Sequence, residues 1–268
     1  MSLNPFYSIQ SPAFDIEYLN SYTLKIELSS EALRVAVFEN DTLLVLEEYN
    51  LEKSKPYPSL TEEIKEIFNQ HLFLKANYWS DIQVYIESAF CFSIASDIFD
   101  ISQVKSYEAI FYPEKLNLNY SNFVISENTY STGYDVLLND FFDEIYPSKK
   151  IEINTTSKKI IHYQNRKLEK NTCILYFSEN HFYVYHCRGK SNRKTIFNIQ
   201  EYDESELKNV LQYAEKIVLY GKITTFNPIY TKLEQISKEA SFGVLPITFK
   251  GLTFSADLPA YRFLSILI

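Results

Sequence analysis

The sequence predicts a mixed α/β protein made of two related halves, each with the element order β-β-β-α-β-α. Residues 22–49 contain three short runs that either alternate apolar with polar side chains or are rich in β-branched and aromatic residues. An amphipathic helical pattern and a further strand follow them. The same order begins again at residue 172. A shift of 149 residues (173 − 24) aligns the apolar positions of the two copies: Leu24, Ile26, Leu28, Leu33 and Val35 fall on Cys173, Leu175, Phe177, Phe182 and Val184.

The composition fits a packed globular protein. The chain has 268 residues, of which 46% are hydrophobic and 22% are charged, so it can form one large domain or two of ordinary size. No segment approaches the run of about 20 apolar residues that a membrane helix needs, and the first residues do not resemble a signal peptide. Three cysteines at irregular spacing indicate reduced thiols rather than a disulfide framework. We therefore expect a cytoplasmic protein with no membrane partner.

In the first half, strands are expected at Tyr22–Leu28, Ala32–Glu39 and Thr42–Tyr49. Ser59 and Glu62 have the spacing of a capping box. The helix that it would start has an apolar face made of Leu60, Ile64, Ile67, Phe68 and His71. A fourth strand is expected at Ile82–Glu87.

The second half repeats this order. Its three opening strands are expected at Thr172–Ser178, His181–Cys187 and Lys194–Gln200. A helix over Asp203–Glu215 and a strand over Lys216–Tyr220 follow. Asn227 and Pro228 then start a helix that runs through Ile236, with proline at the first helical position.

The middle of the chain is expected to contain a strand at Phe90–Ile94 and helices at Tyr134–Tyr146 and Thr156–Leu168. The last helix is expected at Leu258–Ile268. We place the boundary near residue 165. Residues 1–165 then form the first half with an inserted middle segment, and residues 166–268 form the second half.

Two β-β-β-α-β-α halves resemble the plan of the superfamily of actin, heat-shock protein 70 and the sugar kinases, which has a ribonuclease H-like architecture. Residues 22–41, 106–113 and 259–264 also resemble an uncharacterised bacterial family with a degenerate actin-like ATPase fold. This resemblance covers nearly the whole chain, although its individual motifs are mostly apolar patterns. It implies an actin-like fold whose nucleotide site has degenerated.

Active members of this superfamily hold ATP between the halves, and each half contributes a hairpin of the type Asp-x-Gly. The glycine lets the backbone approach the phosphates, and the aspartate helps to position the metal and the water. The matching turns here contain Ser29 and Ser30 in the first half, and Ser178 and Glu179 in the second, so both lack the aspartate and the glycine.

The adenosine site of such proteins carries a Gly-Gly pair after the fourth strand of the second half. Here the sequence is Leu219-Tyr220-Gly221-Lys222, so one glycine of the pair is kept as Gly221, and Tyr220 would crowd the site. The resemblance therefore implies degenerate cleft positions at Ser29, Ser30, Ser178, Glu179 and Gly221, with no catalytic residue and no cofactor. For the serines, the alternative interpretation is an ordinary turn residue, and for Gly221 a turn at the end of a strand.

No other motif for catalysis or metal binding was found. The sequence contains no phosphate-binding Gly-Lys-Ser/Thr pattern, no Gly-x-Ser-x-Gly elbow and no His-Glu-x-x-His pair. The four histidines, at positions 71, 162, 181 and 186, do not have the spacing of a metal site. We expect no metal.

The charge is distributed unevenly along the chain. Residues 1–148 contain 8 Lys/Arg and 23 Asp/Glu, a net of −15, whereas residues 149–194 contain 11 and 3, a net of +8. The densest basic run, Arg188, Lys190, Arg193 and Lys194, is expected at the turn between the second and third strands of the second half. Such a tip can dock an anionic partner, contact the acidic first half, or remain a solvated loop.

Three functions remain open at this point. The first is a non-catalytic binding or scaffold protein whose partner is another protein. The second is an active ATPase or kinase with atypical cleft residues. The third is an RNA-associated accessory protein that uses the basic hairpin, although a pI of about 5.2 argues against general nucleic-acid binding.

Overall fold

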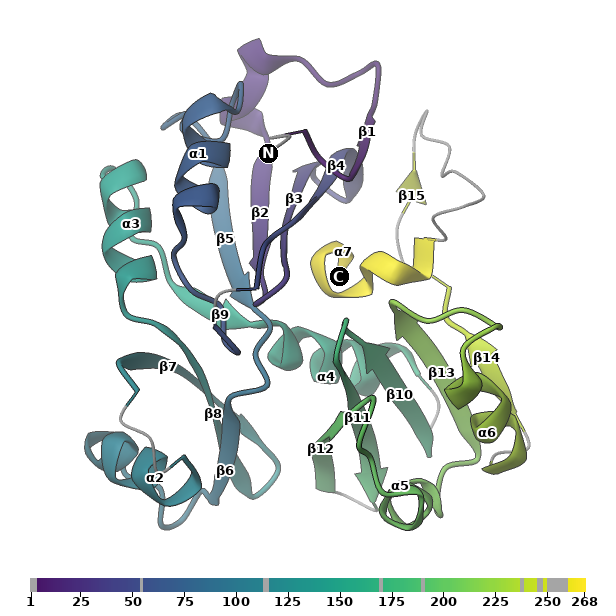
Figure 1. Ribbon diagram of the computed structural model, residues 1–268. Coiled ribbons are helices and arrows are strands. Elements are labelled where there is room, and N and C mark those ends of the chain that lie inside the picture. The colour runs from purple at the N-terminus through teal and green to yellow at the C-terminus, as the bar shows by residue number, and fades with distance from the viewer. Residues whose placement is uncertain are drawn as a thin grey trace. The chain divides into compact units, whose positions relative to one another are not determined.

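The computed structural model describes residues 4–53, 55–112, 116–168, 171–188, 191–236, 239–244, 248–249 and 260–268 (Figure 1). The chain divides into two compact units. The first comprises Met1–Val124, Asn128–Thr156 and Ile247–Thr253, and the second comprises Ile125–Glu127, Ser157–Pro246 and Phe254–Ile268. The boundary near residue 165 stays a prediction. Each unit is described by itself below.

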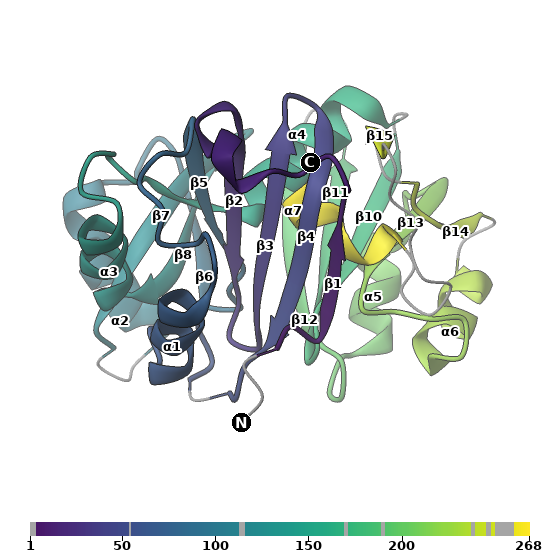
Figure 2. The same ribbon diagram turned by 90° about the horizontal axis from the view of Figure 1, so that it is seen from above.

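A mixed sheet organises the first unit, and Figure 2 shows most of its strands side by side. The order of the described strands is β1-β4-β3-β2-β5-β9, with β15 also paired to β4. β2, β3 and β4 form an antiparallel meander, and β5 and β9 add to it in parallel. The bounds are Tyr7–Gln10 (β1), Thr23–Leu28 (β2), Ala32–Glu39 (β3), Thr42–Asn50 (β4), Asp81–Ile86 (β5), Ile153–Thr155 (β9) and Thr248–Phe249 (β15).

One face of this sheet packs against two amphipathic helices, α1 (Glu62–Gln70) and α3 (Leu137–Ile145). Alternation along β2 directs Leu24, Ile26 and Leu28 into the same core as Phe68 of α1 and Phe142 of α3. A short 3-10 helix, η1 (Ile16–Ser21), precedes β2.

The predicted inserted segment forms a small sheet of its own. Its described strands lie in the order β6 (Cys91–Ala95), β8 (Asn128–Asp135) and β7 (Leu118–Ile125). Between β6 and β7 lie η2 (Ile101–Gln103) and α2 (Val104–Phe111). The rings of Phe92 and Phe111 stack with centroids 5.2 Å apart, which joins α2 to this sheet.

The longest segment of the second unit begins within α4 (Thr156–Lys167), whose first residue belongs to the first unit. Its sheet has the described order β12-β11-β10-β13-β14. The bounds are Thr172–Phe177 (β10), His181–Arg188 (β11), Ser191–Asn198 (β12), Lys216–Gly221 (β13) and Ala240–Phe242 (β14). Helices α5 (Glu204–Leu211) and α6 (Pro228–Ile236) share a core with one face, and η3 (Ala260–Phe263) and α7 (Leu264–Leu267) complete the unit.

The two sheets open with the same strand pairing. Leu28 pairs with Leu33 across the first hairpin, and Phe177 pairs with Phe182 across the second. In both sheets the fourth strand lies parallel to the first strand of the meander. The prediction of two mixed sheets, each opening with a three-strand meander, is therefore confirmed.

Two predicted helix starts were wrong. Thr61, not Ser59, caps α1, because its Oγ1 accepts a hydrogen bond from the backbone N–H of Ile64 at 3.2 Å. Strand β8 extends through Asp135, so the helix expected from Tyr134 begins only at Leu137. The alternating pattern of β8 and the helical spacing of α3 overlap at this junction. The residues shared by the two patterns join the strand, because β8 pairs within its sheet.

The third strand of the second half also starts earlier than predicted. β12 begins at Ser191 instead of Lys194, so Arg193 also lies within the strand and not in the turn before it. Arg193 and Lys194 pair with His186 and Tyr185 of β11. At the C-terminus, Leu258 of the expected helix lies outside the described residues, and Phe263 and Leu267 are buried as predicted.

Candidate functional site

The first candidate position is the turn between β2 and β3. Ser29 is buried, and its backbone N–H donates to the carbonyl of Ala32 at 2.9 Å. Its Oγ accepts hydrogen bonds from the N–H groups of Ala32, at 2.9 Å, and Glu31, at 3.2 Å. Two N–H groups that could face a phosphate are thus satisfied by a side chain of the turn itself. Ser30 lies half-buried beside them.

The second candidate position is the turn between β10 and β11. The backbone N–H of Ser178 donates to the carbonyl of His181 at 2.9 Å. The carboxylate of Glu179 forms an ion pair of 2.7 Å with Lys222, whose side chain is only 15% exposed. A phosphate at this turn would meet the negative charge of Glu179, and the nearby cation Lys222 is already paired.

Gly221 ends β13 at a φ of 88°, in the region that favours glycine. A Cβ atom at this position would lie 2.1 Å from the carbonyl oxygen of Phe177 on the neighbouring strand. Close approach of two backbones therefore accounts for this glycine.

Tyr220 is buried beside Gly221. A Cβ atom added at Gly243 would lie 1.9 Å from the Cζ atom of Tyr220, so the ring packs directly against the glycine backbone. Burial raises the pKa of the Tyr220 hydroxyl above its usual range, with a smaller contribution from Tyr163. The ring thus fills space inside the second unit.

The basic run is divided between positions with different surroundings. Arg193 is exposed, whereas the Nζ of Lys194 lies 4.7 Å from the ring centroid of Tyr183. Lys190 lies outside the described residues, as does the side chain of Arg188. Because Arg193 and Lys194 are neighbours on a strand, their side chains point to opposite faces.

Sequence reasoning missed a buried charged row across β2, β3 and β4. Arg34 contacts Glu27 at 2.5 Å and Glu48 at 2.7 Å, and all three side chains are at most 4% exposed. The signal was present, because the confirmed meander makes Glu27, Arg34 and Glu48 cross-strand neighbours. The Oε2 atom of Glu27 is buried without a hydrogen-bond partner in the described part of the chain.

Within the described ranges, no group of three or more His, Cys, Asp or Glu side chains could hold a metal ion. No described helix is long and apolar enough to cross a membrane.

Residues 11–238 match the family model described as "Protein of unknown function (DUF3822)". The chain belongs to this family. This member of the DUF3822 family has two sheets of shared topology and a further sheet of three described strands. The comparison with curated proteins found no match.

The fold is that of the actin-like ATPases. A Bacteroides thetaiotaomicron protein with an actin-like ATPase fold and unknown function matches with a TM-score of 0.69 and 17% identity. The match covers 86% of this chain and 93% of that one. A chain of the PilM–PilN type IV pilus biogenesis complex matches with a TM-score of 0.56 and 10% identity, over 91% of this chain and 97% of that one. These likenesses confirm the predicted architecture.

Proposed function

We propose that the chain is a non-catalytic binding or scaffold protein on a degenerate actin-like fold, with another protein as its partner. The observation that carries this proposal is the chemistry of the two turns. Ser29 satisfies the N–H groups of its own turn, and Glu179 places a carboxylate where the superfamily leaves room for phosphate. Both features oppose tight binding of a triphosphate.

The proposal includes a common origin of the two halves, 1–165 and 166–268, by internal duplication. The shared strand order and the shared pairing of Leu28–Leu33 and Phe177–Phe182 support it. It also includes a bacterial source and a cytoplasmic location, the latter supported by three cysteines whose irregular spacing fits no disulfide framework. The PilM–PilN complex supports a protein partner by analogy, since its name describes an assembly of two proteins.

The test is thermal unfolding of the full chain with and without magnesium-ATP at millimolar concentration. A ligand present at 100 times its Kd would stabilise the native state by about 2.7 kcal/mol, which raises the Tm of a chain of this size by roughly 5–10 °C. We expect no shift beyond that given by magnesium sulfate at the same ionic strength. A shift of several degrees with ATP alone, together with phosphate release, would establish the active ATPase or kinase instead.

A further inference from the structure

The first unit carries a groove of about 600 Å³ between α1 and α3. Its apolar lining comes from Leu60, Leu137, Phe141 and Ile145. Leu137, the first residue of α3, is 50% exposed at one end of this apolar stripe. The groove therefore offers apolar surface that the unit itself does not cover.

Helix α3 presents two adjacent stripes to this groove. Leu137, Phe141 and Ile145 follow one another at intervals of four residues, and so do Asp140 and Glu144. Residues four apart lie on one face of a helix, so the apolar and acidic stripes run side by side. Among the described residues, neither Asp140 nor Glu144 has an ion-pair partner.

The lysines on the opposite rim are already engaged. Lys65 pairs with Glu62 of its own helix at 2.7 Å, and Lys75 donates to the side-chain oxygen of Asn69 at 2.9 Å. Lys75 keeps its positive charge because Asn69 is neutral, but among the described residues neither lysine forms an ion pair with Asp140 or Glu144. The whole region of residues 1–148, with its net charge of −15, increases the attraction for a basic partner.

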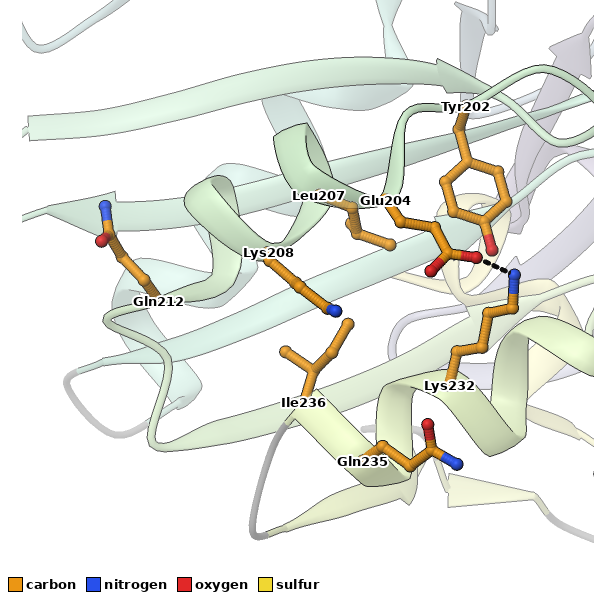
Figure 3. A pocket seen from close by; sticks show the side chains of 8 residues that line it. All are labelled: Tyr202, Glu204, Leu207, Lys208, Gln212, Lys232, Gln235 and Ile236. Atoms are coloured by element: carbon orange, nitrogen blue, oxygen red, sulfur yellow. Dashed lines mark hydrogen bonds and ion pairs between the residues drawn. The ribbon is translucent and has the colours of Figure 1, made fainter.

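The corresponding groove of the second unit, between α5 and α6, differs (Figure 3). Its volume is about 360 Å³, and an ion pair between Glu204 and Lys232 joins its two helices. The ring of Tyr202 lies 5.5 Å from the Nζ of Lys232 and lines the same end of the pocket. The ion pair between Glu204 and Lys232 thus crosses the second groove. The described residues of the α1/α3 groove form no such ion pair from one helix to the other.

We propose that the α1/α3 groove binds a basic amphipathic helix of a partner protein. Apolar side chains of that helix would pack on Leu137, Phe141 and Ile145, and its Lys or Arg side chains would face Asp140 and Glu144. A helix fits because side chains at i and i+4 repeat every 6 Å or so along its axis, which matches the repeat of both stripes on α3. The inference rests on the proposed function and names the partner's chemistry.

The test uses a fluorescently labelled synthetic helix of about 15 residues, with leucine on one stripe and lysine on the next. Its binding to the full chain is followed by anisotropy, without nucleotide. We expect Leu137→Ser to weaken binding by about tenfold or more, since a leucine contact is lost. Asp140→Asn with Glu144→Gln should weaken it by about three- to tenfold, because two exposed charge pairs disappear.

The matched control is Asp143→Asn, an exposed acid on α3 outside the groove lining, which should leave the affinity unchanged. A second control peptide carries glutamate in place of every lysine and should bind at least tenfold more weakly. Circular dichroism and an unchanged Tm verify that each variant is folded.

Four results would overturn the proposal: no binding of the lysine peptide at millimolar chain concentration, equal binding of the two peptides, equal loss with Asp143→Asn, or a dimer of this chain that Leu137→Ser abolishes. The last result would make a second copy the occupant. A failure of the proposed function can be told apart from these results. It would appear as stabilisation of the chain by ATP, which is measured independently of peptide binding.

Discussion

The sheets of the two units share their backbone plan in detail. After the third strand, the N–H of Leu51 donates to the carbonyl of Glu31, and the N–H of Ile199 donates to that of Asn180. Beyond the fourth strand, the N–H of Glu87 donates to Leu28, as that of Lys222 does to Phe177. The same turns and pairings thus recur although the side chains differ.

The faces opposite the helical cores differ in chemistry. The first sheet buries Glu27 and Arg34, whereas the second buries Tyr176 and Tyr183 at the positions 149 residues later. The Tyr176 hydroxyl lies 2.8 Å from the Oγ of Ser265 in α7. The comparison teaches that apolar alternation on one face suffices for this topology, while the other face can carry ions or hydroxyls.

Arg34→Met should have the largest effect. It leaves Glu27 and Glu48 buried without a counter-charge, which typically costs about 3–5 kcal/mol. The matched change in the second sheet, Tyr183→Phe, removes one hydroxyl and should cost about 1 kcal/mol. Urea unfolding measures both variants. If Arg34→Met lowered the free energy of unfolding by no more than Tyr183→Phe, the chemical difference between the two faces would not affect stability.

Gly221→Ala should have the second-largest effect on the free energy of unfolding. The position has a positive φ, and the new Cβ would meet the Phe177 carbonyl, so a loss of about 2–4 kcal/mol is expected. The first sheet has Ile86 at the same place beside Leu28. Gly133→Ala is the control, because its nearest neighbour is a side-chain atom of Leu118. Equal unfolding midpoints for the two variants would contradict the assignment of Gly221 to backbone approach.

The smallest effects concern the caps of α1 and α5. Thr61→Ala should cost about 1 kcal/mol at every pH, since a hydroxyl does not titrate in the acid range. Asp203 accepts hydrogen bonds from the side chain and N–H of Ser205 and from the N–H of Glu206, and these bonds lower its pKa. Its contribution should be complete above about pH 4 and be lost as the pH falls through the folded-state pKa.

Thermal unfolding at pH 7 and pH 3 separates these caps. The difference in Tm between Asp203→Ala and the parent protein should be smaller at pH 3 than at pH 7, whereas the difference for Thr61→Ala should stay the same. A constant difference for Asp203→Ala would show that its carboxylate does not provide the cap.

The helices and strands that begin and end nearest to their predicted residues are those whose sequence pattern involves only near neighbours. β3 begins and ends at the predicted residues, because a run that is apolar except for Arg34 and the final Glu39 lies between two polar turns. The missing Asp and Gly of the hairpins were also readable directly. In contrast, β1 and β9 were not predicted, because each is short and exists through pairing with distant strands. The ion pair of Glu179 with Lys222 joins residues 43 apart and has no local pattern.

The sequence by itself determined the meanders, the amphipathic helices and the absence of Asp and Gly from the two turns, because periodicity and turn chemistry act between near neighbours. Only the tertiary structure decided that Glu27, Arg34 and Glu48 form one buried row and that α1 and α3 enclose an open groove. Both depend on strand order and on helix packing across a sheet. These arise when the whole chain buries its apolar surface together, so no short stretch of sequence contains them.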